Sequence, residues 1–176
     1  LRYGIPEFKM EKRVLDRRMQ QMEQEGVTFI TNANVGENIA VDQLRADYDV
    51  IVLTGGACDR RDLPVEGREL SGVHQAMDYL PMQNHICEGD EKPADFIDAK
   101  DKHVVIIGGG DTGADCLGTA NRQQAKSVHQ LEIMPQPPET RAENNPWPQW
   151  PRVYRTASAH EEGVERLYSV STKKLI

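Results

Sequence analysis

The sequence has no long apolar run and no excess of positive charge, and these two absences exclude several classes of protein. None of its apolar stretches approaches the roughly 18 residues that a transmembrane helix needs, and residues 1–13 lack the apolar core of a signal peptide. The 176 residues include 21 Lys and Arg against 28 Asp and Glu, a net charge of −7. Because nucleic-acid binding needs a basic surface, we predict neither a membrane nor a nucleic acid as partner.

Metal-binding and catalytic motifs are also missing. The three cysteines, Cys58, Cys87 and Cys116, form no Cys-x-x-Cys pair, which argues against a disulfide framework, a zinc site or an iron–sulfur motif. The five histidines show no ligand spacing, and neither Gly-x-Ser-x-Gly nor His-Glu-x-x-His is present. We therefore predict no metal ligand, and the cysteine usage favours the cytoplasm.

The sequence does contain an alternation of helix-like and strand-like segments. Continuous apolar runs at 50–53 and 104–107 are typical of strands buried on both faces of a parallel sheet, and 27–31 is rich in β-branched and aromatic residues. Apolar residues at three- and four-residue spacing predict a helix over 9–25, after which Gly26 favours a left-handed cap. The remaining predictions are helices over 41–46, 74–84 and 111–124, strands over 128–134 and 165–175, and a turn within 156–163.

The apolar run at 104–107 ends in three glycines, and a predicted helix follows at once. Gly108, Gly110 and Gly113 stand in Gly-x-Gly-x-x-Gly register within a β-α-β unit, which is the pattern of a dinucleotide-binding fold. The first glycine permits a tight turn, the second admits a pyrophosphate close to the backbone, and the third lets the helix approach the sheet. A glycine-rich turn without a ligand is the alternative, and it explains fewer of the glycines. We predict a Rossmann-like α/β fold, a three-layer parallel sheet with helices.

The other candidate site residues surround this loop. Gly109 belongs to it, and Asp111 and Thr112 are expected near the helix start, where the dipole favours a carboxylate. Glu132, near the end of the second strand, stands where an acidic residue binds the ribose 2′-hydroxyl of NAD(H). The 2′-phosphate of NADP(H) requires a cation instead, and Arg141 is the nearest candidate after the strand. The residues by themselves therefore lean towards NAD(H).

Several segments resemble a known family. IVLTGGACDRRDLPVEG (51–67) resembles the stretch of two-domain flavoprotein reductases that closes the FAD domain before a second glycine motif opens the nucleotide domain. The segments LRYGIPEFKM, GGGDTGADC, PPETRAENNPWPQWPRV and HEEG (160–163) more closely resemble the small (beta) subunits of bacterial glutamate synthases. These segments span nearly the whole chain. Gln124 stands where that family often has a helix-ending glycine.

The resemblance implies that 1–72 is the terminal portion of an FAD-binding domain and 73–176 the front portion of an NAD(P)H-binding domain. It implies that the loop over 108–113 cradles NADPH and that Thr54, Gly55 and Gly56 lie near FAD. The implied enzyme is an NADPH-dependent oxidoreductase that passes hydride from NADPH to FAD, and the resemblance makes no side chain of this chain a catalyst, because the cofactors carry the chemistry. Its electrons would reach the large (alpha) subunit through iron–sulfur clusters, for synthesis of glutamate from glutamine and 2-oxoglutarate.

The family's cysteine motifs, its first glycine motif and its carboxy-terminal flavin segment are missing, and the chain lacks an initiator methionine. We therefore expect a central fragment that alone neither holds FAD tightly nor turns over. Two alternatives stay open: a subunit of another NAD(P)H:ferredoxin-type flavin reductase, and a non-catalytic nucleotide-fold interaction module. The resemblance favours NADP(H), which we follow, with Arg141, or Arg122 or Lys126 from the helix side, as the cation. NAD(H) is the alternative cofactor.

Overall fold

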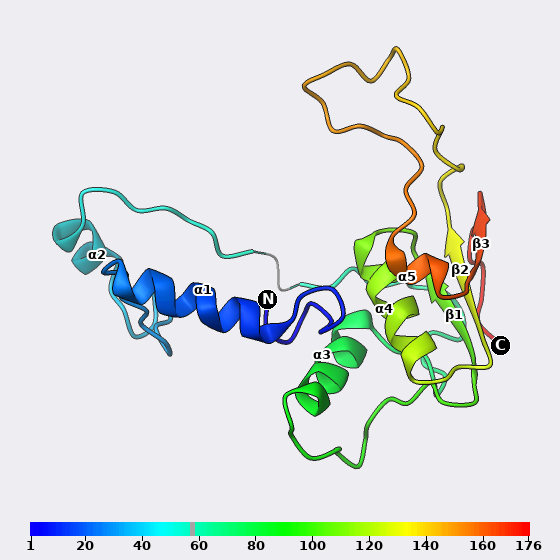
Figure 1. Cartoon of the computed structure of the whole chain (residues 1–176), viewed down its shortest axis with the longest axis horizontal. Helices are drawn as coiled ribbons and strands as arrows, with labels where there is room; N and C mark the ends of the chain where they lie inside the picture. Colours follow the sequence, from blue (N-terminus) through cyan, green and yellow to red (C-terminus); the bar gives the residue numbers. More distant parts are fainter. Residues whose placement is uncertain (57–58) are drawn as a thin grey trace. The chain divides into compact units, whose positions relative to one another are not determined.

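The chain divides into two compact units. The computed structural model describes residues 1–56 and 59–176 (Figure 1). The sheet unit comprises Leu1–Glu11 and Leu63–Ile176, and the helical unit comprises Lys12–Asp62. Cys58, one of the three cysteines considered above, lies outside the described residues.

A parallel sheet forms the centre of the sheet unit. Its strands β1 (His103–Ile107), β2 (Ser127–Glu132) and β3 (Glu165–Tyr168) lie side by side in that order. Both pairings are parallel, with Ile107 opposite Leu131 and Glu132 opposite Tyr168 near the strand ends. The carboxyl ends of the strands therefore meet at one edge of the sheet (Figure 1). The α/β class and the strands expected over 104–107 and 128–134 are confirmed. Of the segment 165–175, which was also expected to be a strand, only the first part forms one.

Helix α4 (Asp111–Arg122) connects β1 to β2 and packs against the sheet. Its residues Ala114, Leu117 and Ala120 are buried at three-residue spacing and join Val128 of β2 in the main core cluster. Leu117 is 0 % exposed, and burying such a side chain contributes about 1.5–3 kcal/mol. Gln124 follows the helix with φ 66°, the left-handed conformation that a helix-ending glycine ordinarily supplies.

Helix α5 (Ser158–Glu161) and the amino-terminal segment pack against α4. Gly118 makes this possible, because a Cβ there would lie only 2.6 Å from Cζ of Phe8 and 2.9 Å from Cβ of Ala159. The Arg122 guanidinium lies 3.6 Å from the Phe8 ring centroid and holds Glu162 through bonds of 2.5 and 2.8 Å. A short helix thus occupies part of the stretch for which the sequence predicted only a turn.

Helix α3 (Ala76–Cys87) also packs against α4, close to its predicted position. Tyr79 Oη donates a 2.9 Å hydrogen bond to Oε1 of Gln123, and Asn84 Nδ2 donates to the carbonyl of Tyr3 at 2.6 Å and to that of Ile5 at 3.1 Å. The first bond ties α3 to the end of α4, and the other two tie the amino-terminal segment to α3.

The opposite face of the sheet is exposed among the described residues. Val105 and Ile107 of β1 are 59 % and 47 % exposed, and Leu167 of β3 is 40 % exposed. Val104 and Ile106, which alternate with them, pack against the core cluster. The expectation that the run over 104–107 is buried on both faces is therefore wrong, because α4 packs on one face of the strand and no described helix packs on the other.

The helical unit contains α1 (Lys12–Gln24) and α2 (Val41–Asp47). Both form close to where the sequence predicts them, and Gly26 after α1 has φ 94°, the expected left-handed cap. No helix among the described residues is long and apolar enough to cross a membrane.

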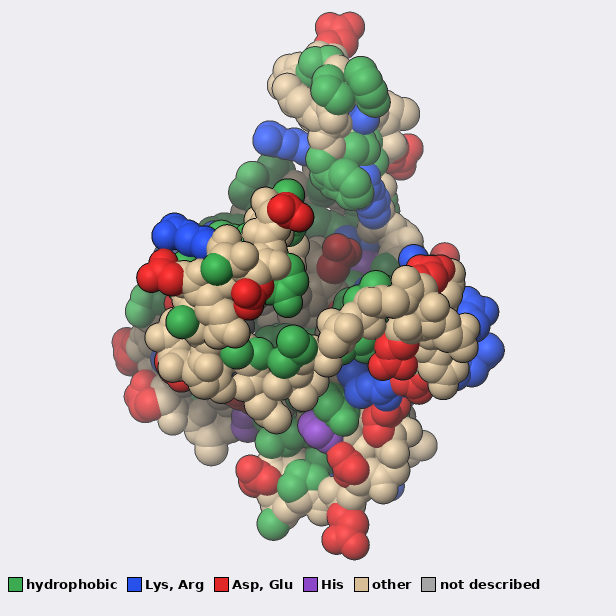
Figure 2. All heavy atoms as spheres, turned by 90° about the vertical axis from the view of Figure 1, so that its left-hand side faces the viewer, with side chains coloured by type: hydrophobic (Ala, Val, Ile, Leu, Met, Phe, Trp, Pro, Cys, Tyr) green, Lys and Arg blue, Asp and Glu red, His purple; other side chains and the backbone are tan. Residues whose placement is uncertain are grey.

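The strands predicted within the helical unit do not form. Residues 27–31 and 50–53 have no strand structure, and Leu53 is 90 % exposed. A strand needs a neighbour for its backbone N–H and C=O groups, and the described part of this unit has only an isolated bridge between Val35 and Ile39. On the face drawn in Figure 2, hydrophobic side chains lie at the surface among acidic and basic ones.

Candidate dinucleotide-binding site

The glycine loop leaves the sheet at the end of β1 with a sharp turn. Gly108 has φ 123°, a conformation that side-chain-bearing residues rarely adopt. Its amide donates a 2.8 Å hydrogen bond to the Leu131 carbonyl of β2. The first glycine of the motif is therefore required by the backbone conformation itself.

The second glycine of the motif caps α4. Gly110 has an extended backbone (φ −81°, ψ −175°), and its carbonyl accepts a 3.0 Å hydrogen bond from the Ala114 amide. A Cβ at Gly110 would meet nothing within 4 Å, so the space beside this backbone is open. Asp111 and Thr112 form the first turn with exposed side chains. Because the first amides of a helix have no partner within it, this end of α4 can bind an anion.

The third glycine lets α4 approach the loop closely. A Cβ at Gly113 would overlap with the Gly108 carbonyl oxygen and lie 2.7 Å from Nε2 of Gln130. That carbonyl is already held by a 2.9 Å hydrogen bond from the same Nε2. It cannot move away without breaking this bond, so any larger residue at position 113 would strain the loop.

Glu132, the last residue of β2, turns its carboxylate into the glycine loop. Its Oε2 accepts a 2.8 Å hydrogen bond from the Gly109 amide, and its Oε1 accepts one of 2.9 Å from the Met134 amide. A Cβ at Gly109 would overlap with Oε2. The structure therefore brings Glu132 to the glycine loop, with both carboxylate oxygens engaged by backbone amides.

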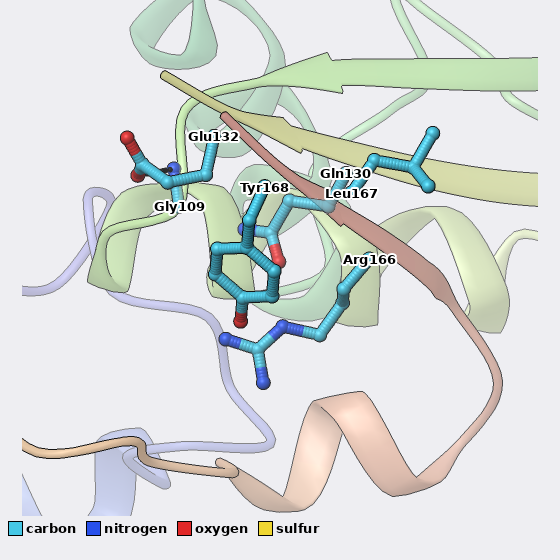
Figure 3. A pocket seen from close by; sticks show the side chains of 6 residues that line it. All are labelled: Gly109, Gln130, Glu132, Arg166, Leu167 and Tyr168. Carbon is cyan, nitrogen blue, oxygen red and sulfur yellow. Dashed lines mark hydrogen bonds between the residues drawn. The ribbon is translucent and has the colours of Figure 1, made fainter. Parts of the chain in front are cut away.

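A shallow hollow lies beside the loop, at the carboxyl ends of β2 and β3. Because Gln130 is paired with Arg166, and Glu132 with Tyr168, these four side chains project from the same face of the sheet. In Figure 3 the Glu132 carboxylate points towards Gly109, whereas the Arg166 guanidinium lies near the Tyr168 ring. The residues that line the hollow are Gly109, Gln130, Glu132, Arg166, Leu167 and Tyr168.

Arg166 brings positive charge to this hollow, and the sequence analysis did not predict it. Its Nη1 donates to Oη of Tyr154 at 3.1 Å and to the Arg155 carbonyl at 3.2 Å. Burial raises the pKa of the neighbouring Tyr168, so this phenol stays a neutral group. The alternation of β3 places residues 166 and 168 on one face, but a four-residue strand does not reveal its register with β2.

Gln130 and His160 form a second group behind the loop that the sequence analysis also did not predict. Gln130 is 2 % exposed, and its Oε1 lies 3.2 Å from Nε2 of His160. The His160 Nδ1 accepts a 2.9 Å hydrogen bond from the Ala157 amide. Burial, followed by the charge of Arg166, lowers the pKa of His160, so the imidazole is neutral at pH 7. Thirty positions separate the two residues in sequence, and no spacing rule connects them.

Arg141 lies in the proline-rich segment between β2 and α5. Its Nη1 donates to the carbonyls of Asn145 and Gln149 at 2.9 and 3.0 Å. Asn145 is buried and accepts a 2.8 Å hydrogen bond from the Arg152 amide. Arg141 therefore holds this segment together, and its role towards a 2′-phosphate stays a prediction.

The remaining predicted site residues belong to the helical unit. Thr54, Gly55 and Gly56 are exposed, and Gly56 has φ 71°. Their place near FAD stays a prediction. Across residues 1–56 and 59–176, no group of three or more His, Cys, Asp or Glu side chains is arranged to hold a metal ion.

Comparison with known proteins identifies relatives over the whole chain. It is 59% identical over 180 residues to the glutamate synthase [NADPH] small chain of Mycobacterium tuberculosis (strain ATCC 25618 / H37Rv), and the match covers 100% of this chain and 37% of that protein. It is 44% identical to the protein of the same name from Bacillus subtilis, with the same coverage. It is also 46% identical to the glutamate synthase [NADH] of Schizosaccharomyces pombe, over 98% of this chain and 9% of that protein.

The chain spans 37% of the length of these two bacterial relatives. A family model described as pyridine nucleotide-disulphide oxidoreductase matches residues 36–165. This match covers most of the chain and includes the glycine loop, α4 and the strands β1 and β2 that flank it. The chain therefore belongs to the pyridine nucleotide-disulphide oxidoreductase family.

Proposed function

We propose that this chain is the electron-input part of a glutamate synthase small chain and that it binds NADPH. The observation that carries the proposal is the open space beside Gly110, at the amino end of α4 and the carboxyl edge of a parallel sheet. A dinucleotide pyrophosphate needs such a position. Similarity over the whole of this chain to part of glutamate synthase small chains favours this function over another flavin reductase or an interaction module.

In this proposal the loop over 108–113 holds the pyrophosphate with the amides of its second half, because those of Gly108 and Gly109 already donate to Leu131 and Glu132. The nicotinamide supplies a hydride for FAD, and the protein supplies placement, so no side chain here is assigned acid–base catalysis. We keep the division into an FAD-domain portion over 1–72 and a nucleotide-domain portion over 73–176, with Thr54, Gly55 and Gly56 near FAD in the longer protein. The iron–sulfur clusters lie outside this chain.

The partner that we propose for the longer protein is the glutamate synthase large subunit. The assembled enzyme would form glutamate from glutamine and 2-oxoglutarate. We also propose a cytoplasmic location, because Cys87 and Cys116 are free thiols.

We further propose NADP(H) rather than NAD(H) as the cofactor. A ribose 2′-hydroxyl would have to share the Glu132 carboxylate, because each of its oxygens already accepts one backbone amide, from Gly109 and from Met134. A 2′-phosphate needs a cation. Arg166 lines the hollow and is therefore our first candidate, with Arg141 as the second. The relatives carry both NADPH and NADH in their names, so the preference calls for direct measurement.

Calorimetric titration of the full chain with NADPH and with NADH tests both parts of the proposal. NADPH should bind more tightly, and Arg166→Gln should weaken its binding by about ten- to a hundredfold, the range for a charged hydrogen bond, without changing NADH binding. Arg141→Gln tests the second candidate in the same way, and the variant that loses affinity for NADPH but not for NADH identifies the cation. Preference for NADH would instead assign Glu132 to the ribose, and a folded chain that binds neither cofactor would overturn the proposed function.

The same preparation tests whether the chain alone retains flavin. We expect a colourless protein, because only part of an FAD domain is proposed to be present. A bound-flavin absorption spectrum after purification would contradict that expectation.

A further inference from the structure

We propose that His160 is a positioning residue of the dinucleotide site, which acts through Gln130 to hold the peptide group between Gly108 and Gly109. The inference deepens the proposed function and rests on it where the ligand is concerned. Its structural basis is a continuous chain of hydrogen bonds from α5 to the glycine loop.

The direction of this hydrogen-bond chain is determined by a backbone group at each end. The Ala157 amide can only donate, so His160 Nδ1 accepts its hydrogen and Nε2 carries the ring proton. Nε2–H then donates to Oε1 of Gln130 at 3.2 Å. The Gln130 amide in turn donates from Nε2 to the Gly108 carbonyl at 2.9 Å. All three bonds point the same way, an arrangement in which hydrogen bonds strengthen one another.

This series of hydrogen bonds ends at the peptide group between Gly108 and Gly109, which is held on both sides. The Gly108 carbonyl accepts from Gln130, and the Gly109 amide donates to Glu132 at 2.8 Å. Glycines have wide conformational freedom, so without such bonds this peptide could rotate. Its orientation determines where the following backbone amides point, including those that would meet a pyrophosphate.

The residues that follow His160, Glu162 and Gly163, are anchored to the carboxyl end of α4. Glu162 binds Arg122 through two bonds, and the Gly163 carbonyl accepts a 2.9 Å hydrogen bond from Nδ2 of Asn121. The HEEG segment (160–163) therefore connects the glycine loop at one end of α4 with the last turn at the other. This gives a physical role to a motif that the proposed function leaves unexplained.

The surroundings of His160 favour the neutral imidazole, which is the form that these hydrogen bonds require. Arg166 of β3 and Lys9 of the amino-terminal segment are the charged groups that face it. Together with burial they lower the pKa of His160. A protonated Nδ1 would confront the Ala157 amide with a second donor, so the neutral ring is required.

Two neutral replacements of similar length separate positioning from general stability. Gln at position 160 can accept from the Ala157 amide, as in a capping box, and still donate to Gln130, whereas Met can do neither. We expect His160→Met and Gln130→Met each to weaken NADPH binding about tenfold, and the double variant to be no weaker than either, because both break one network. His160→Gln should bind like the wild type. Glu162→Gln, which weakens only the contact with Arg122, should leave the dissociation constant for NADPH unchanged.

Amide hydrogen exchange of Gly109 in the ligand-free chain provides a readout that needs no cofactor. Exchange should accelerate in His160→Met and Gln130→Met and not in His160→Gln. Unchanged Gly109 exchange in His160→Met, or fully additive losses of affinity, would overturn the positioning role. If the wild type binds no dinucleotide, the proposed function fails, and the exchange rates still decide whether His160 holds the loop.

Discussion

Three glycines in or next to α4 should respond differently to alanine, because each has a different neighbour. At Gly110 an added methyl group meets open space. At Gly113 it would overlap with the Gly108 carbonyl oxygen, and at Gly118 it would press on Phe8 and Ala159. Only the first two positions belong to the proposed pyrophosphate loop, so the series separates folding from binding.

The magnitudes follow from steric cost and helix propensity. Overpacking lowers the free energy of unfolding by about 1–3 kcal/mol. Replacing glycine by alanine within a helix raises it by up to about 1 kcal/mol. Gly113→Ala should therefore lose about 1–2 kcal/mol, because the Gly108 carbonyl is held by Gln130. Gly118→Ala should lose about 1 kcal/mol, since the outer end of the Phe8 ring can shift. Gly110→Ala should lose less than about 1 kcal/mol, as expected at an N-cap.

Thermal unfolding and calorimetric titration with NADPH check the series. A loss of 1 kcal/mol lowers the Tm of a chain of this size by about 2–4 °C, so Gly113→Ala should melt roughly 2–8 °C below the wild type. Gly110→Ala should lower the Tm by less than about 4 °C and lose at least about tenfold in affinity, because its methyl group occupies the pyrophosphate's approach to the backbone. Gly118→Ala should lower the Tm by about 2–4 °C and bind NADPH like the wild type. Wild-type affinity in Gly110→Ala, or wild-type Tm in Gly113→Ala, would refute the reasoning.

Three further predictions concern a histidine, the thiols and an exposed segment. The lowered pKa of His160 means that its contribution to stability is complete above the ordinary pKa of about 6.5. It is lost as the pH falls towards the folded-state value, so Tm should drop more steeply on acidification in the wild type than in His160→Gln, and equal slopes would argue against it. Burial, and then the charge of Asp115, raises the pKa of Cys116 to about 12. Iodoacetamide at about pH 8 should therefore alkylate exposed Cys87 and spare Cys116 until the chain is denatured, and mass spectrometry of the peptides would expose any equal labelling. Amides over 50–53 should exchange with solvent within seconds, and slow exchange would mean that this segment pairs with a strand after all.

The glycine loop and its helix could be predicted because their requirements are local. The positive φ of Gly108, the open backbone at Gly110 and the close approach at Gly113 depend on neighbours only a few positions away. The strands at 27–31 and 50–53 could not be predicted reliably. Their apolar composition is that of a strand, but strand formation depends on hydrogen bonds to a distant segment, and none of the described residues supplies one.

The sequence by itself determined the β-α-β unit, the conformation of the glycine loop and the place of Glu132 at a strand end, because residue type and short spacing dictate each of them. Only the tertiary structure decided which side chains surround the loop. It placed Arg166 beside the hollow through the register of β2 with β3, and it joined His160 to Gln130 through the packing of α5 on α4. Such contacts depend on distances between segments that lie 30 or more positions apart, and residue spacing carries no information about those distances.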